Sequence, residues 1–260
     1  HTKGFIILVN GRIVMEHYFN GHNANLPWYW ASAGKTLTTA TIGIAEEEGL
    51  LNINDKVSDY LGTGWTSTPL SKENLITNKH LLSMTSGLDD SVGNGNTPAD
   101  LQYIADAGTR WAYHNVFEKL QDVIAEATNQ SFDAYFTTKL KNKIGMTGGW
   151  FESDEFNVYW STTRSAARFG LLSLNKGRWN TEVIVPEEFM LAATSTSQSL
   201  NNAYGYLWWL NGKANYRLPQ TQLIFSGSLI PSVPNDMYCA LGKNDQKIYV
   251  IPSKKMVVVR

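Results

Sequence analysis

The chain has 260 residues, of which 43% are hydrophobic and 17% charged, and its formal net charge at pH 7 is −1. This length supports one large domain or two intertwined domains with a substantial core. The sequence has no run of basic residues, so we expect no nucleic-acid partner. No apolar stretch reaches the ~18 residues that a membrane-spanning helix needs.

The first elements predicted along the chain are a hairpin and a helix. Residues 5–9 and 13–19 form two apolar runs that flank Asn10-Gly11, which is the strongest short-range hairpin signal. A helix is expected from the segment around Ser32 through residue 48, and Gly49 ends it.

The remaining pattern divides the chain into a helical middle and a strand-rich end. Helical periods dominate from about residue 56 to residue 174, at residues 79–84, 116–127, 132–140 and 165–174. Strand patterns then return, at residues 204–210, 222–225, 237–241, 247–251 and 256–259.

Strands near both ends of the chain must pair to satisfy their backbone groups. We therefore predict a mixed α/β domain built from residues 1–55 plus 175–260 and a mainly helical domain formed by residues 56–174. A catalytic cleft is expected between the two domains, where small-molecule sites often lie.

The tetrad Ser32-Ala33-Gly34-Lys35 is the most informative local motif. Residues three apart on a helix share a face, so the amine of Lys35 can reach the hydroxyl of Ser32. A serine hydroxyl needs a base to become a nucleophile, and a desolvated lysine with a lowered pKa can act as that base. On the tetrad alone, the alternative is that Ser32 caps a helix and that Lys35 is a solvated charge.

A second motif, Tyr113-His114-Asn115, adds the groups that acyl transfer needs. A phenol beside a lysine can exist partly as phenolate and can pass a proton to a leaving group. Asn115 can hold a substrate carbonyl or the lysine. We expect His114 to point away on a loop. Lys35 and Tyr113 titrate as a coupled pair, so the sequence leaves open which of them is the general base.

A third motif lies where a predicted strand ends at Gly242, near the C-terminal end of the sequence. A glycine at this position lets a substrate approach the backbone closely. The order Ser-x-x-Lys, Tyr-x-Asn and a glycine-ended strand resembles the penicillin-recognising serine hydrolases, which include serine β-lactamases, penicillin-binding proteins and related esterases and amidases. The Tyr-x-Asn form is similar to the class C β-lactamases and to their esterase and 6-aminohexanoate-oligomer hydrolase relatives.

The resemblance implies a fold and a mechanism. The fold is an α/β (α+β) β-lactamase/transpeptidase-like fold, an antiparallel sheet flanked by helices with an inserted all-helical domain. The mechanism is attack by Ser32 on an acyl carbonyl, with proton transfer through Lys35 and Tyr113. We expect the oxyanion between the backbone N–H groups of Ser32 and Lys243, and neither a metal nor an organic cofactor is needed.

One departure from the family pattern bears on the substrate. β-Lactamases have Lys-Thr-Gly as the third motif, whereas this chain has Ala240-Leu241-Gly242. The cation that helps bind a β-lactam or peptide carboxylate is therefore absent, although Lys243 could replace its charge. We expect a small-molecule ester first, a small amide or D-amino-acid peptide second and a β-lactam last. A penicillin-binding-like sensor without turnover is the non-enzymatic alternative.

Aromatic residues near the motifs are candidates for the substrate pocket. We expect Trp111 and Trp208 to line an apolar acyl or aryl pocket, and Trp209 is a further candidate for it. Cys239, the only cysteine, excludes an internal disulfide and is expected to be a buried apolar residue. An α/β-hydrolase triad is disfavoured, because Trp30 occupies the first glycine position of the Gly-x-Ser-x-Gly elbow.

The sequence leaves oligomeric state open. The family resemblance favours a periplasmic or secreted location. The first residue is His1 rather than Met, so we expect further residues upstream, and no closing helix follows the last predicted strand, so we expect further residues there too.

Overall fold

The computed structural model describes residues 2–153 and 156–260, so His1 lies outside the described residues. Its largest sheet has six antiparallel strands in the order β2-β1-β13-β12-β11-β8. The strand bounds are β1 Gly4–Val9, β2 Arg12–Tyr18, β8 Trp209–Leu210, β11 Tyr238–Gly242, β12 Gln246–Ile251 and β13 Met256–Val259.

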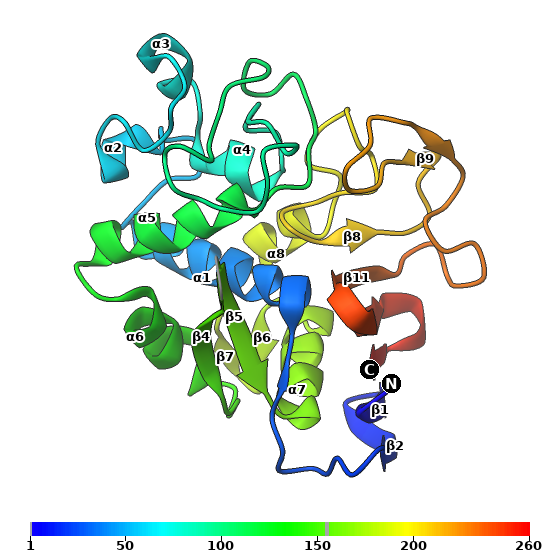
Figure 1. The fold of residues 1–260 in the computed structure, drawn as a ribbon. Coiled ribbons are helices and arrows are strands. Elements are labelled where there is room, and N and C mark those ends of the chain that lie inside the picture. The colour runs from blue at the N-terminus through cyan, green and yellow to red at the C-terminus, as the bar shows by residue number, and fades with distance from the viewer. Residues whose placement is uncertain (1, 154–155) are drawn as a thin grey trace.

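The predicted hairpin at the start of the chain is confirmed. Strands β1 and β2 pair across Asn10 and Gly11, whose φ angles of 50° and 75° lie in the left-handed region that this tight turn requires. Strand β1 also pairs with β13, with Ile6 opposite Val259, so the two ends of the chain lie side by side (Figure 1). The antiparallel sheet is therefore built from both ends, as the fold class predicted.

Helix α7 (Thr163–Leu174) packs on this sheet against β1, β12 and β13. The Thr162 side chain caps it by accepting a hydrogen bond from the backbone of Ser165. The predicted domain boundary near residue 174 assigned this helix to the helical domain, whereas its packing joins it to the sheet. The division into two domains otherwise stays a prediction.

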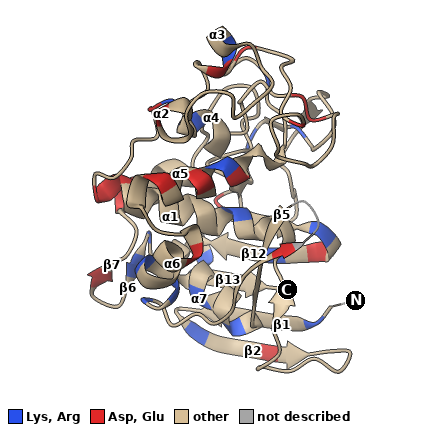
Figure 2. Cartoon of the chain, turned by 60° about the vertical axis from the view of Figure 1, so that its left-hand side comes forward, with Lys and Arg blue, Asp and Glu red and all other residues tan. Residues whose placement is uncertain are grey.

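The segment between β2 and the sheet's return is mainly helical. After strand β3 (Trp28–Tyr29) and the 3₁₀ turn η1 (Ala31–Gly34) come helices and turns whose bounds are α1 Lys35–Glu47, α2 Ser58–Leu61, α3 Leu70–Glu73, α4 Asn78–Leu82, η2 Asn115–Glu118, α5 Lys119–Thr128, α6 Phe132–Phe136 and the π-helical turn η3 Thr137–Lys141. The ribbon of α5 carries both basic and acidic positions (Figure 2).

Two features of the middle segment were not predicted. It also contains the antiparallel strands β4 (Gly149–Ser153) and β5 (Phe156–Ser161), and β5 pairs with β3. The inserted region is therefore not all-helical. The prediction missed this pair because its aromatic-rich stretch stood between two strong helical patterns.

The strand-rich end is less regular than predicted. The patterns at residues 204–210 and 222–225 give only β8 and the short strand β10 (Phe225–Ser226), which pairs with β9 (Asn215–Tyr216). The other elements there are β6 Arg178–Trp179, β7 Glu182–Val183, α8 Glu187–Ala193, η4 Lys243–Asp245 and η5 Pro252–Lys254. Long loops between them carry several residues of the site described below.

Helix α1 forms the centre of the molecule. Every residue from Lys35 to Ala45 is buried, and the helix contacts α5 and α8 (Figure 1). Its buried threonines find partners: Thr39 donates to the carbonyl of Tyr206, and Gln121 donates to Thr38. No helix among the described residues is long and apolar enough to cross a membrane.

Candidate active site

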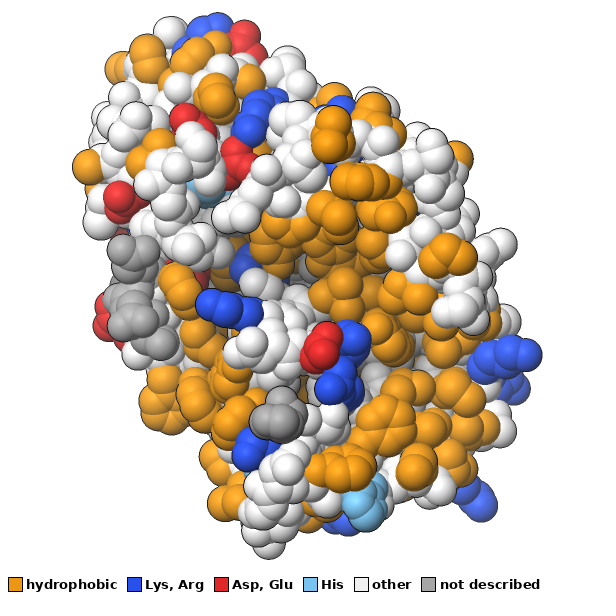
Figure 3. Space-filling model, turned by 45° about the vertical axis from the view of Figure 1, so that its right-hand side comes forward, with side chains coloured by type: hydrophobic (Ala, Val, Ile, Leu, Met, Phe, Trp, Pro, Cys, Tyr) orange, Lys and Arg blue, Asp and Glu red, His pale blue; other side chains and the backbone are white. Residues whose placement is uncertain are grey.

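Two cavities meet at Ser32. The larger, of about 460 Å³, is lined by Ser32, Lys35, Tyr113 and Asn115 together with polar and aromatic side chains. The smaller, of about 270 Å³, also contains Ser32 and Tyr113 and is otherwise mostly apolar. Figure 3 shows a hollow in this face of the molecule with hydrophobic side chains gathered along one side of it. The sequence motifs therefore converge on one site.

Ser32 lies on a tight turn between β3 and α1. Ala31, the residue before it, has a φ of 47°, a left-handed conformation that non-glycine residues rarely adopt. Trp30 holds the other side of the turn: its backbone N–H donates to Tyr159, and its indole N–H donates to the hydroxyl of Ser161 at 2.7 Å. These bonds keep the strained turn in place and present the Ser32 hydroxyl at the junction of the cavities.

Lys35 is buried directly beside the nucleophile. Its Nζ donates to Ser32 Oγ at 2.9 Å and to Asn115 Oδ1 at 3.4 Å, and it lies 4.3 Å from the centre of the Phe117 ring. Burial lowers the pKa of Lys35 to about 8, and the negative charge of Glu118 partly opposes this shift. A substantial fraction of the amine is therefore neutral near pH 8, as a general base requires.

Tyr113 lines both cavities and stacks on Trp209, with ring centres 5.7 Å apart. Burial raises the pKa of Tyr113 to about 12, and the Ser32 hydroxyl lowers it only partly. The phenol therefore favours its protonated form at neutral pH, because burial disfavours its anion more than the hydrogen bond with Ser32 favours it.

Asn115 and His114 have separate roles. Asn115 accepts from Lys35 and donates to the backbone of Asn94 at 3.2 Å, so it orients the lysine. His114 accepts the Val116 backbone N–H at Nδ1 and thereby caps η2. His114 is 4% exposed and lines the larger cavity, so the expectation that it points away on a loop is wrong.

Gly242 lets β11 approach the backbone of η1. A Cβ added to Gly242 would lie 2.4 Å from the carbonyl oxygen of Trp30 and 3.1 Å from the amide nitrogen of Ala33. The sequence predicted that a substrate would approach Gly242 closely. In the structure, the backbone at η1 approaches Gly242 closely. The glycine thereby brings the end of β11 next to Ser32.

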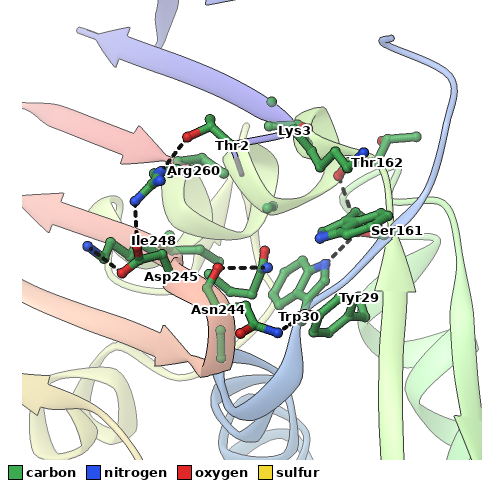
Figure 4. A pocket seen from close by; sticks show the side chains of 18 residues that line it. Thr2, Lys3, Tyr29, Trp30, Ser161, Thr162, Asn244, Asp245, Ile248 and Arg260 are labelled. Atoms are coloured by element: carbon green, nitrogen blue, oxygen red, sulfur yellow. Dashed lines mark hydrogen bonds and ion pairs between the residues drawn. The ribbon is translucent and has the colours of Figure 1, made fainter. Parts of the chain in front are cut away.

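A third, small cavity lies behind this contact and does not include Ser32. There Asn244 donates to the hydroxyl of Tyr29, and Arg260 bridges Thr2 and Asp245 (Figure 4). These bonds fix the turn that follows Lys243.

The third motif has lost its cation but not its backbone. Ala240 is 1% exposed and does not line either cavity at Ser32. Lys243, in contrast, lines both cavities. The lysine that these cavities have at this end is therefore Lys243, one residue beyond the glycine.

Two of the three predicted tryptophans do not line the site. Trp111 is 1% exposed and packs behind Tyr113 against Tyr204 and Trp209. Trp208 is also 1% exposed and stacks on Phe169 in the core. Their assignment to the pocket is wrong, because both side chains pack in the core and neither lines a cavity at Ser32.

Trp209, which follows Trp208, is the tryptophan that lines the smaller cavity. Sequence reasoning missed Glu118, a buried carboxylate in the larger cavity. The backbone of Asn157 donates to it at 2.9 Å, and the amide of Asn96 donates to it at 2.6 Å. Burial raises the pKa of Glu118 to about 7. An acidic residue at the start of a helix looks ordinary in a sequence, so only its burial identifies it.

The remaining titratable residues show no metal centre. Among residues 2–153 and 156–260, no three His, Cys, Asp or Glu side chains gather as metal ligands would. Cys239 is buried in β11, as predicted, and burial raises the pKa of its thiol.

Comparison with known proteins agrees with the fold. Residues 4–260 match the family described as Beta-lactamase. A Bacillus subtilis protein assigned as the penicillin-binding protein PbpX is 30% identical over 173 residues, which cover 59% of this chain and 42% of that protein. The match thus spans less than half the length of this curated relative.

Two solved structures share the fold. One, from Bacillus anthracis and assigned as a 6-aminohexanoate-dimer hydrolase, has a TM-score of 0.79 at 22% identity and covers 99% of this chain and 72% of its own. The other is EstCE1, a hydrolase with promiscuous acyltransferase activity, with a TM-score of 0.73 at 12% identity over 98% of this chain and 87% of its own.

The fold is thus β-lactamase/transpeptidase-like, and Ser32, Lys35 and Tyr113 lie together in it. The chain belongs to the β-lactamase family.

Proposed function

We propose that this protein hydrolyses a small carboxylic ester through an acyl-enzyme on Ser32. The observation that carries the proposal is the buried Lys35, whose Nζ lies 2.9 Å from Ser32 Oγ and whose pKa is lowered to about 8. The fold itself does not require a lysine amine to be buried beside a serine. Desolvation of the amine raises the free energy of its charged form and makes it a base near neutral pH.

The proposed steps follow from the positions of three side chains. Neutral Lys35 takes the Ser32 proton as Oγ attacks the carbonyl carbon. The oxyanion lies between the backbone N–H groups of Ser32 and Lys243. The proton then passes through the Tyr113 phenol to the leaving oxygen as its bond to carbon breaks. A water repeats the sequence, with its proton returned to Ser32 and the acid released.

The pKa values support a division of roles within the pair. The pKa of Lys35 is about 8 and that of Tyr113 is about 12. Near neutral pH, the neutral amine of Lys35 is therefore far more populated than the phenolate of Tyr113. Lys35 is therefore the proposed general base, and Tyr113 relays the proton.

The third motif favours an ester over a β-lactam or a peptide. Ala240 is buried and cannot supply a cation for a substrate carboxylate. An ester also has a better leaving group than an amide and depends less on binding energy from the third motif. A small amide is the second candidate, because the same acyl-enzyme chemistry serves it.

The test is hydrolysis of p-nitrophenyl butyrate by the native protein and by Ser32→Ala, with nitrocefin in parallel. We expect ester turnover that the substitution abolishes, and little nitrocefin turnover. Ester turnover that survives the substitution would refute the proposal. A stable Ser32 acyl adduct without turnover, detected by intact-protein mass, would instead identify a sensor.

A further inference from the structure

The smaller cavity at Ser32 is an apolar groove with the nucleophile at one end. We call it the leucine groove and define it by the apolar residues that line it with Ser32 and Tyr113: Trp209, Leu218, Pro219, Leu229 and Leu241. Its volume is about 270 Å³. Gly242 and Lys243, which also lies on the larger cavity, complete the lining. A charged or strongly hydrated group placed among the apolar residues, away from Lys243, would lose its water without gaining partners.

The wall of the leucine groove is held in place by hydrogen bonds. Arg217, next to Leu218, donates to the carbonyl of Leu200 at 2.8 Å and to the carbonyl of Gln222 at 2.8 Å. Gln222 in turn donates to the carbonyl of Trp111 at 2.9 Å. The loop that carries Leu218 is thus tied to the segment just before Tyr113. The groove is formed before a substrate arrives.

The larger cavity on the other side of Ser32 differs in chemistry. It contains Lys35, Asn115 and two acidic residues, Asp90 and Glu118. Lys35 lines this cavity and not the leucine groove. The water that attacks an acyl-enzyme must reach Lys35, and by microscopic reversibility it approaches along the path by which the leaving group departed. The larger cavity, which we call the polar cavity because Lys35, Asp90 and Glu118 line it, is therefore the side of the leaving group and water.

We propose, resting on the proposed esterase function, that the leucine groove binds the acyl chain and that the substrate is an ester of a medium-length aliphatic acid. The carbonyl carbon lies at Ser32, the alkyl chain lies along Leu218 and Leu229, and the alcohol points into the polar cavity. The apolar wall keeps water away from the chain, while Tyr113 lies at the boundary between the two sides.

The test is a series of p-nitrophenyl acetate, butyrate, hexanoate and octanoate, each kcat/KM divided by the rate of hydroxide hydrolysis of the same ester. Each buried methylene is worth about 0.8 kcal/mol, which corresponds to about a fourfold rise in kcat/KM until the groove is full. Leu218→Ser should lower the octanoate-to-acetate ratio at least about fivefold. Leu223→Ser is the matched control, since Leu223 lies in the same loop, is 67% exposed and does not line the groove.

Each outcome bears on a separate claim. A flat series with turnover that depends on Ser32 would overturn the acyl-chain assignment and leave the esterase function standing. A steep series that Leu218→Ser leaves unchanged would overturn the same assignment. In a parallel series of alkyl acetates the alcohol is varied instead of the acid, and a dependence on chain length seen only in that series would also overturn it. No Ser32-dependent turnover of any ester would overturn the proposed function and this inference together.

Discussion

The turn at Ser32 and the end of strand β11 face each other across the site, and they differ in what they retain. The segment from Ser32 to Lys35 keeps the side chains that family chemistry needs, with Lys35 Nζ at 2.9 Å from Ser32 Oγ. Strand β11 has Ala240 in place of the cation, yet Gly242 still meets the η1 backbone. In the proposed mechanism, side chains activate the nucleophile, whereas strand β11 contributes to the oxyanion site through its backbone.

The largest effect is expected from Lys35→Met, which tests the side-chain contribution because it keeps the length of the side chain and removes the base. We expect kcat/KM for the best ester to fall about 10²- to 10⁴-fold. The melting temperature should not fall, because a buried amine is replaced by an apolar group. Activity within about threefold of native would show that Lys35 is not the base.

Gly242→Ala tests the backbone contribution of β11. The added Cβ would meet the Trp30 carbonyl, so the strand must move away from η1. Displacing an oxyanion donor costs about 10²- to 10³-fold in kcat. Lys243→Ala, which leaves its N–H in place, is the control and should change kcat on a neutral ester less than about fivefold. A larger loss in the control than in Gly242→Ala would reverse the comparison.

The two adjacent tryptophans separate the site from the core. Trp209→Phe should lower kcat/KM about tenfold, since it removes contact area from the leucine groove and from Tyr113. Trp208→Phe should leave kcat/KM of the folded protein unchanged and lower the melting temperature by several degrees, about 2–4 °C for each kcal/mol lost. Equal kcat/KM losses in both variants would place Trp208 in the site after all.

The pH profile gives the smallest expected effect. Neutral Lys35 is needed for attack, so kcat/KM should rise with pH through a midpoint of about 8. Glu118 raises the pKa of Lys35, so Glu118→Gln should move this limb to lower pH, where the neutral amine then forms. Glu188→Gln, at an exposed position on α8, is the control. An unmoved limb in Glu118→Gln would remove Glu118 from the proton network.

Local motifs were predictable where one short segment sets the geometry. Three-residue spacing on a helix places Lys35 beside Ser32, and the family order of motifs brings Tyr113 there. The sequence did not separate Trp208 from Trp209, because Trp208 packs in the core on Phe169, which is far from it in the sequence. Glu118 was missed because its burial depends on Asn96 and Asn157, which lie far from it in the sequence.

The pairing of β1 with β13 has a consequence for how the protein is made. Strand β1 leaves the ribosome long before β13 exists, so the sheet cannot close until nearly all of the described chain is available. The contact between Gly242 and η1 depends on strands of that sheet. Ser32 is therefore translated early, yet the site proposed around it is complete only at the end of folding, so the proposed activity must wait until the chain has folded.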